Sequence, residues 1–157
     1  MPKLPALDPQ DVELIATTGY PPPFDNATEG RAKRRLTDPL GLTRMGVNVT
    51  EIAPDAKSSI RHWHSHEDEF VLVLEGEVTL VTDAGEQVLS AGMCAGFPAG
   101  VADGHCIVNT SGAPAKILEV GTRDMEDEAA YPDVDLHCQP GRYVTPVFTK
   151  KDGTPIG

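Results

Sequence analysis

The stretch RHWHSHEDEFVLVLEGEV (residues 61–78) decides most of what can be predicted for this chain. His62 and His64 lie two residues apart, and in an extended strand every second side chain points to the same face. Two imidazoles can therefore be directed to one point inside a sheet, and Glu69 on the next strand can supply a third ligand. Imidazoles with a carboxylate suit Fe, Mn, Co, Ni, Cu or Zn. We predict one divalent metal ion here, and the ligand set fits any of these ions.

A second segment, GMCAGFPAGVADGHCIVN (residues 92–109), supplies a fourth candidate ligand. His105 is the only histidine between residues 83 and 123, and it lies in a β-rich run of its own. Three histidines and one glutamate leave open positions on a six-coordinate ion, which a substrate or O2 can occupy. The predicted metal ligands are thus His62, His64, Glu69 and His105.

These two segments resemble the two sequence motifs of the cupin superfamily. The first motif is G-x5-H-x-H-x(3,4)-E-x6-G, and the residues that fit it are His62, His64, Glu69 and Gly76, with Ala56 in place of the leading glycine. The second motif is G-x5-P-x-G-x2-H-x3-N, and the residues that fit it are Gly92, Pro98, Gly100, His105 and Asn109. Asp103 stands where the second motif places its histidine, because four residues separate Gly100 from His105. The intact H-x3-N spacing favours His105 over Asp103 as the ligand.

The resemblance is to the small single-domain bacterial cupins, some of which carry sugar-phosphate-isomerase labels. It implies an all-β fold, a single antiparallel, jelly-roll-like cupin β-barrel. It also implies a metal at the mouth of the barrel and, frequently, a homodimer.

The sequence pattern of residues 42–123 predicts the same class of fold. Short β-rich runs alternate with turn residues, and no helical periodicity separates them, which indicates an antiparallel sandwich or barrel. The predicted strands are Arg44–Ile52, Glu69–Leu74, Glu77–Thr82, Gln87–Ser90, Gly104–Asn109 and Lys116–Thr122. The continuous apolar runs FVLVL and VTLV predict strands that are covered on both faces.

The barrel core is flanked by two extended arms. Residues 1–41 form a proline-rich arm, in which we predict a short helix from Pro9 to Ala16 with Asp8 as its N-cap. Residues 124–157 form an acidic tail with an edge strand, Arg142–Phe148, that Pro146 keeps out of a sheet interior. Both arms are poor in apolar residues, so they either wrap the barrel or exchange with a second subunit.

Charge and composition exclude several partners. The chain has 13 basic and 24 acidic residues, a net charge of -11, which disfavours nucleic acid. No stretch approaches the roughly 20 apolar residues that span a membrane, and no export signal is visible, so we expect a cytoplasmic protein. Cys94, Cys106 and Cys138 are then predicted to be free thiols. The one basic cluster is predicted to form a solvated face or an intersubunit contact, with a phosphate grip as the less favoured alternative; it contains Arg31, Lys33, Arg34 and Arg35.

Other residues near the predicted metal are assigned roles by their position. His66 and Asp68 are candidates for moving a proton, with Glu67 as an alternative to Asp68. The predicted pocket wall consists of Phe70, Phe97 and Met93. Cations at the rim would be needed for a sugar phosphate, and the candidates are Arg44, Lys57, Arg61 and Arg123.

Two classes of function follow from these residues. The first is a metal-dependent enzyme that acts on a small oxygenated molecule, with oxygenation, isomerisation (including a sugar-phosphate-isomerase-like reaction) and decarboxylation all open. The second is a non-catalytic cupin that binds or senses a small ligand.

Overall fold

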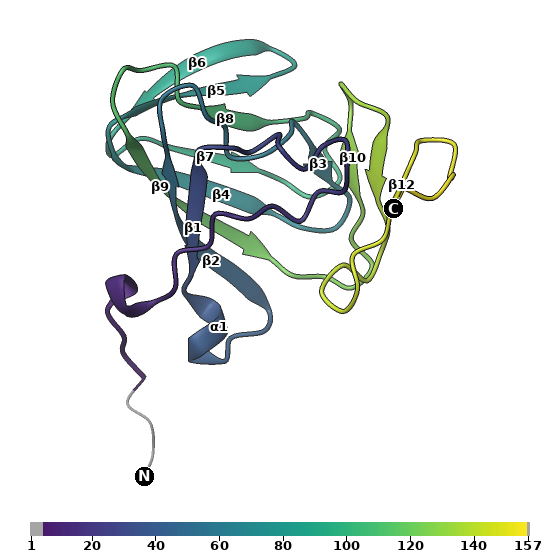
Figure 1. Cartoon of the computed structure of the whole chain (residues 1–157), viewed down its shortest axis with the longest axis horizontal. Helices are drawn as coiled ribbons and strands as arrows, with labels where there is room; N and C mark the ends of the chain where they lie inside the picture. The colour runs from purple at the N-terminus through teal and green to yellow at the C-terminus, as the bar shows by residue number, and fades with distance from the viewer. Residues whose placement is uncertain (1–4, 157) are drawn as a thin grey trace.

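Three antiparallel sheets form the core of this protein in the computed structural model, which describes residues 5–156 (Figure 1). The largest has the order β1-β2-β9-β4-β7 and consists of β1 (Arg31–Arg35), β2 (Met45–Ile52), β9 (Ala115–Thr122), β4 (Glu69–Glu75) and β7 (Cys94–Phe97). The second contains β6 (Gly85–Ser90), β5 (Glu77–Thr82) and β8 (Cys106–Val108), and the third contains β12 (Phe148–Thr149), β11 (Leu136–Cys138), β10 (Ala129–Tyr131) and β3 (Trp63–His64). Within residues 5–156, helix is confined to the 3-10 turn η1 (Pro9–Asp11) and to α1 (Thr37–Leu40). The predicted all-β, jelly-roll-like barrel is confirmed.

The inward face of the large sheet is apolar at one end of its strands and polar at the other. Ile117 of β9 pairs with Thr50 of β2 and with Val73 of β4, and Ile117 and Val73 are almost fully buried. Alternation sends every second residue inward, and further along the same strands the inward residues become Glu119 and Glu69. The apolar core therefore fills one end of the barrel, and a polar interior is left at the other end.

The outward face of β4 differs from the prediction. Phe70 and Leu74 are 40% and 39% exposed, whereas Val71 and Val73 are buried. The apolar run FVLVL is thus covered on one face only, because β4 lies in a sheet whose outer side is not covered by another layer of the described chain. The prediction was wrong for this run and right for VTLV in β5, where the consecutive residues Val78, Thr79 and Leu80 are all buried.

A buried asparagine joins the strands at the apolar end. The Asn109 side-chain amide donates hydrogen bonds to the carbonyl oxygens of Ile52 and Ala113, both at 2.8 Å. Gly76, in the turn between β4 and β5, has a φ of +79°, and a Cβ there would lie 2.9 Å from the Pro114 carbonyl oxygen. Asn109 and Gly76, which both belong to the motifs, therefore stabilise the fold and do not act in the candidate site.

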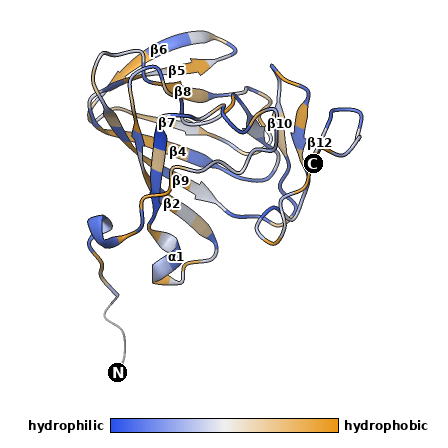
Figure 2. Ribbon diagram, in the orientation of Figure 1, coloured by the Kyte–Doolittle hydropathy of each residue, from blue (hydrophilic) through white to orange (hydrophobic). Residues whose placement is uncertain are grey.

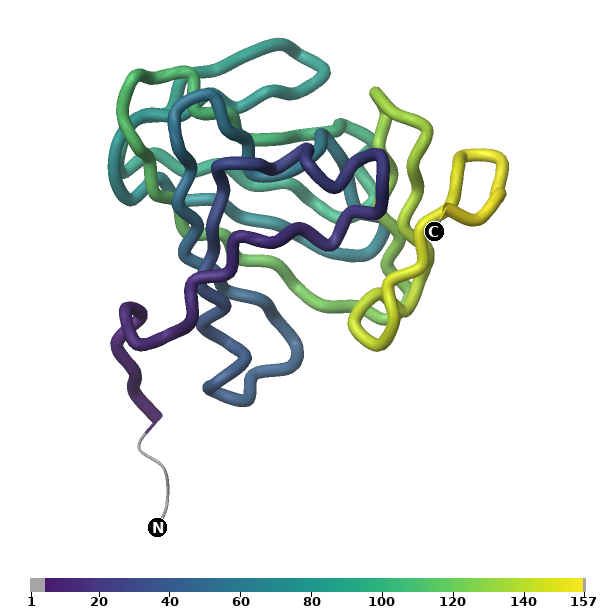
Figure 3. Tube along the Cα trace, in the orientation of Figure 1, coloured from purple at the N-terminus to yellow at the C-terminus, as the bar shows by residue number. Residues whose placement is uncertain are grey.

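The two arms wrap the barrel of their own chain. The N-terminal arm crosses the molecule toward β10 and returns as β1, as the purple trace shows (Figure 3). Its Ile15 exchanges two backbone hydrogen bonds with Lys33, both 2.9 Å long. Tyr20 and Phe24 from this arm pack on a second apolar cluster that includes Leu136 and Tyr131 of the C-terminal arm. Each arm thus buries apolar side chains against the other.

Two local predictions in the arms were wrong. The helix predicted over Pro9–Ala16 is only the 3-10 turn Pro9–Asp11, although Asp8 does cap it by accepting a 2.9 Å hydrogen bond from the Gln10 amide. Pairing of Ile15 with β1 draws the following residues into an extended path. The strand predicted over Arg142–Phe148 is a turn, in which the Val144 amide donates to the Gly141 carbonyl oxygen, and pairing with β11 begins only at Phe148. Among residues 5–156, no helix has the length and apolar character needed to cross a bilayer.

Candidate metal centre

The polar end of the barrel holds a cavity of about 620 Å³ that is partly open to solvent. Its lining comes from the large sheet, from the His62–His105 bridge between the other two sheets, and from both arms. A volume of this size matches sites for small organic molecules, which occupy roughly 300–1,000 Å³. We therefore take this cavity as the candidate functional site.

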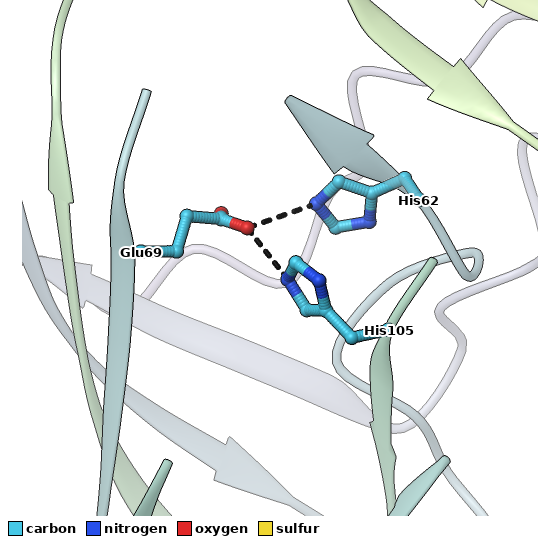
Figure 4. Close-up of side chains that lie close together, drawn as sticks. All are labelled: His62, Glu69 and His105. Carbon is cyan, nitrogen blue, oxygen red and sulfur yellow. Dashed lines mark ion pairs between the residues drawn. The ribbon is translucent and has the colours of Figure 1, made fainter. Parts of the chain in front are cut away.

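Three histidines surround one carboxylate in this cavity, and Figure 4 shows two of them with Glu69. Nε2 of His105 lies 2.6 Å from Oε2 of Glu69, and Nε2 of His62 lies 3.5 Å from the same oxygen. Nε2 of His64 lies 3.3 Å from Oε1 of Glu69. The structure therefore brings the three predicted histidines to Glu69. The ligand atoms of His62, Glu69 and His105 lie within 4.8 Å of one another, and His64 contacts the other oxygen of the Glu69 carboxylate.

Backbone pairing explains why residues so far apart in sequence meet. His62 and His105 form an antiparallel bridge with backbone hydrogen bonds of 3.1 and 2.9 Å. Their rings lie on one face, with centroids 4.8 Å apart. His64, two residues further along, shares the parity of His62, and its ring centroid lies 4.9 Å from that of His62.

The hydrogen bonds behind the rings determine which nitrogens face the cavity. Nδ1 of His62 lies 2.8 Å from the carbonyl oxygen of Ile60, so it carries the proton that this acceptor needs. Nδ1 of His64 lies 2.7 Å from a carboxylate oxygen of Asp127. With Nδ1 protonated, a neutral ring directs the lone pair of Nε2 at Glu69.

This arrangement requires a cation. Lone pairs of imidazole nitrogens and of a carboxylate repel one another at these distances unless a proton or a metal ion lies between them. A carboxylate hydrogen-bonded to the far nitrogen of a ligating histidine is the usual support of a metal site, and Asp127 occupies that place behind His64. The four residues thus fit a divalent ion by their chemistry and by their tautomers.

When no ion is bound, burial and the contacts between Glu69 and the histidines shift the pKa values of these residues. Burial raises the pKa of Glu69, but the charge of His62 and the hydrogen bonds of the three rings outweigh it and hold the pKa well below its usual value. Burial lowers the pKa of His64, yet hydrogen bonds to Asp127 and Glu69 raise it to about 9. Burial dominates at His105 and lowers its pKa. His64 consequently holds a proton more strongly than His105 when no ion is bound.

His105 is positioned by packing rather than by a polar partner. Its ring stacks on Phe97 at a centroid distance of 3.6 Å, with an angle of 4° between the planes. Nδ1 of His105 is buried and has no hydrogen-bond partner among the described residues. Asp103, the alternative at the departure from the motif, instead accepts a 2.8 Å hydrogen bond from the Asp83 amide. His105 therefore faces the cavity centre, whereas Asp103 supports a turn.

A second acidic group lies behind His64. His64, Glu67 and Asp127 place ligand atoms within 4.8 Å of one another. Both carboxylates of this group already have a cationic partner, because Arg142 forms ion pairs with Glu67 and, at 3.5 Å, with Asp127. Tyr143 also donates a hydrogen bond of 2.5 Å to Glu67. We therefore do not interpret this group as a second metal site: Asp127 supports His64 of the first centre, and Glu67 is held by Arg142 and Tyr143.

Of the residues predicted to move a proton, only Glu67 lies at the cavity. His66 is exposed and its Nδ1 lies 2.8 Å from the Ser65 hydroxyl. Asp68 is exposed and accepts a 2.8 Å hydrogen bond from the Ala99 amide. Neither lines the cavity, whereas Glu67, between them in sequence, is 2% exposed and does. Burial raises the pKa of Glu67.

The predicted pocket wall is reproduced only in part. Phe97 lies against the His105 ring, and Phe70 borders the cavity while remaining largely exposed. Met93 does not border the cavity, and its sulfur accepts a hydrogen bond from the Ser90 amide, because it lies in the turn before β7. Of the predicted rim cations, only Arg123 borders the cavity.

Sequence reasoning missed the residues that the arms contribute. Asp127 and Arg142 come from the C-terminal tail, and Tyr20 comes from the N-terminal arm. An acidic tail and a proline-rich arm carry no periodicity that would place individual side chains in a barrel. Only tertiary contacts reveal their part in the site.

Barrel, converging histidines and glutamate together define a single-domain cupin, and the comparisons agree. The family model described as Cupin domain matches residues 48–121. The solved structure of a cupin-superfamily sugar phosphate isomerase from Silicibacter pomeroyi is 43% identical, with a TM-score of 0.91, and the match covers 97% of this chain and 96% of that one. This chain belongs to the cupin superfamily.

More distant structures share the fold. A protein from Acidithiobacillus ferrooxidans is 25% identical with a TM-score of 0.75, covering 85% of this chain and 84% of that one. The polyketide cyclase RemF from Streptomyces resistomycificus is 26% identical with a TM-score of 0.64, covering 79% of this chain and 81% of that one. Among curated proteins, none matches this chain.

Proposed function

We propose that this protein is a metal-dependent cupin enzyme that isomerises a small molecule with a carbonyl and a neighbouring hydroxyl group. The proposal depends above all on one observation: Nε2 atoms of His62, His64 and His105 converge on Glu69 in the cavity at the polar end of the barrel. These four residues would hold one divalent ion. Such an ion would act as a Lewis acid on a substrate oxygen.

Residues of the chain supply the rest of the chemistry in this proposal. Glu67 is the carboxylate that would take up and return the proton between neighbouring carbons, in place of His66 and Asp68. Its buried position and raised pKa make it a stronger base than an exposed glutamate. The Tyr143 hydroxyl, 2.5 Å from Glu67, would hold the proton-transfer group in place.

Isomerisation is favoured over oxygenation and decarboxylation by two observations. The similar protein from S. pomeroyi is described as a sugar phosphate isomerase. The cavity also carries many charged and polar side chains, among them the three histidines, Glu67 and Glu119. A hydroxylated substrate suits this lining better than an apolar one.

Metal content and proton exchange together test the proposal. Purified protein would be analysed for metals, reconstituted with each candidate ion, and incubated in D2O with aldoses, ketoses and their phosphate esters. We expect one bound ion per chain and, by 1H NMR, metal-dependent loss of the signal of the proton next to the carbonyl group, which is on C2 of an aldose and on C1 of a 2-ketose. A fully loaded protein without exchange or turnover would instead support a non-catalytic, ligand-binding cupin, and O2 consumption would support an oxygenase.

A further inference from the structure

Three cations of β1 face the interior of the barrel. Arg31, Lys33 and Arg35 alternate along the strand, and the register pairs Arg31 with Ile52, which is completely buried in the core. Strand alternation therefore directs all three toward the enclosed face, and all three line the cavity of the candidate metal centre. Figure 2 shows β1 as a largely hydrophilic strand. The cluster was predicted to lie on a solvated face or at a subunit contact. Of its four residues only Arg34 faces away from the cavity, and its guanidinium donates to the carbonyl oxygens of Gln10 and Val12 in the N-terminal arm.

Arg31 is a buried charge without a direct counter-ion. It is 7% exposed, and its guanidinium donates to the carbonyl oxygens of Ser58 at 2.8 Å and Thr17 at 3.3 Å. Both acceptors are neutral, and Nε is buried with no hydrogen-bond partner among residues 5–156. Burial of a guanidinium in this state is costly unless an anion approaches it.

The charges around Arg31 leave a positive surplus. Glu119 is the carboxylate on this face, and its Oε2 lies 3.6 Å from Nζ of Lys33 and accepts a 2.8 Å hydrogen bond from Thr50. Arg35 is exposed at the open end and pairs with no carboxylate in the described part of the chain. Three cations and one carboxylate leave two positive charges, in a protein whose net charge is -11.

Other arginines bordering the cavity are already neutralised. Arg123 lies 3.2 Å from Asp38, and Arg142 pairs with Glu67 and Asp127. The surplus is thus specific to β1. Tyr20 lines the same cavity as β1 and the metal centre, and burial raises its pKa to about 12.

We propose that Arg31, Lys33 and Arg35 bind the phosphate group of a phosphorylated substrate whose reacting end reaches the His62, His64, Glu69 and His105 centre. A phosphate monoester carries about -1.5 to -2 charges at neutral pH and three acceptor oxygens, which matches the surplus better than a carboxylate does. This inference rests on the proposed function, since it assigns the two ends of one substrate to two parts of the cavity.

Inorganic phosphate is the probe that tests the phosphate site. Its affinity for the full-length, metal-stripped protein would be measured by calorimetry, with acetate as the carboxylate comparison. Stripping the metal keeps phosphate from binding to the ion itself. We expect saturable phosphate binding, and acetate binding at least about tenfold weaker, because acetate carries a single charge.

Variants that each remove one charge distinguish a phosphate site on β1 from a general effect of the protein's charge. Arg35→Gln and Lys33→Gln should each weaken phosphate binding by about tenfold, since each removes a charge-assisted hydrogen bond. Arg34→Gln removes the same charge from the side of β1 that faces away from the cavity, where the guanidinium donates to the carbonyl oxygens of Gln10 and Val12. It should change affinity by less than about twofold, because Arg34 does not line the cavity. Glu119→Gln should tighten binding by about threefold, since it removes the opposing charge.

Several results would overturn the phosphate site. These are equal effects of Arg34→Gln and Arg35→Gln, acetate binding as tight as phosphate binding, weaker or unchanged binding in Glu119→Gln, and no binding by the unaltered protein. The proposed function is tested separately by metal content and proton exchange. Phosphate binding by a protein that takes up no metal would refute that function alone, and metal loading without phosphate binding would refute the phosphate site alone.

Discussion

Asp127 lies directly behind His64, with its carboxylate oxygen 2.7 Å from Nδ1 of the ring and Glu69 on the opposite side of the same ring. Asp127 is completely buried, and its other oxygen accepts a 2.9 Å hydrogen bond from the His66 amide. This contact connects the C-terminal arm to the barrel motif. It determines both the tautomer and the orientation of His64.

Asp127→Asn should therefore weaken metal binding by about 10- to 100-fold, the usual cost of losing a carboxylate behind a ligating histidine. Metal titration with a competing chelator measures the effect. Asp124→Asn on the same loop, at an exposed aspartate whose side chain caps the Glu126 amide, is the control and should retain full affinity. Equal affinities of the two variants would show that Asp127 does not support the centre.

The histidine triplet offers a second comparison. His64→Ala should strongly lower metal occupancy because one of four ligands is lost. His66→Ala should leave occupancy nearly unchanged, since His66 is exposed and outside the cavity. Elemental analysis of both purified variants provides the measurement, and normal occupancy in His64→Ala would contradict the ligand set.

Glu67→Gln should separate proton transfer from metal binding. Glu67 contacts Tyr143 and Arg142 rather than Nε2 of any ring, so we expect unchanged metal content and at least about a 100-fold loss of proton exchange. Elemental analysis and 1H NMR in D2O, performed on the same preparation, test both halves. Full exchange activity in this variant would exclude Glu67 as the proton carrier.

The stability of the metal-stripped protein should depend on pH through His64. Its pKa is raised from 6.5 to about 9 in the fold, so the protonated ring stabilises the native state fully below about pH 6.5, and this contribution is lost as the pH rises through 9. The loss amounts to about 3 kcal/mol. Urea unfolding between pH 6 and pH 9.5 measures it, with metal-loaded protein as the control because the ion replaces the proton. A stripped protein that loses no more stability than the loaded one would argue against this assignment.

Core packing gives a prediction independent of the site. Ile117 is completely buried, and Ile117→Ala should lower the free energy of unfolding by about 2–5 kcal/mol. Val88→Ala, at a residue that is 53% exposed on β6, should change it by less than about 0.5 kcal/mol. Denaturant unfolding of both variants compares the apolar end of the barrel with its surface.

Local regularity explains which strands and ligands the sequence predicts correctly. A strand has a period of two, so the spacing of His62 and His64 was enough to place both rings on one face. The predicted strands Glu69–Leu74 and Glu77–Thr82 agree closely with β4 and β5. The run at Gly104–Asn109 shortened to Cys106–Val108, and β7, β10 and β11 were not predicted, because their segments are too short to show alternation.

The sequence by itself determined the fold class and the three histidines that meet at Glu69, because strand parity and motif spacing are local properties of the chain. Tertiary structure alone decided which groups surround them. Asp127 reaches His64 across 63 positions of the chain, and Arg31 lines the cavity only because β1 pairs with β2. Such contacts depend on how the arms pack on the barrel. Because this packing buries residues of the acidic tail and of the basic cluster beside the same cavity, both become parts of one site.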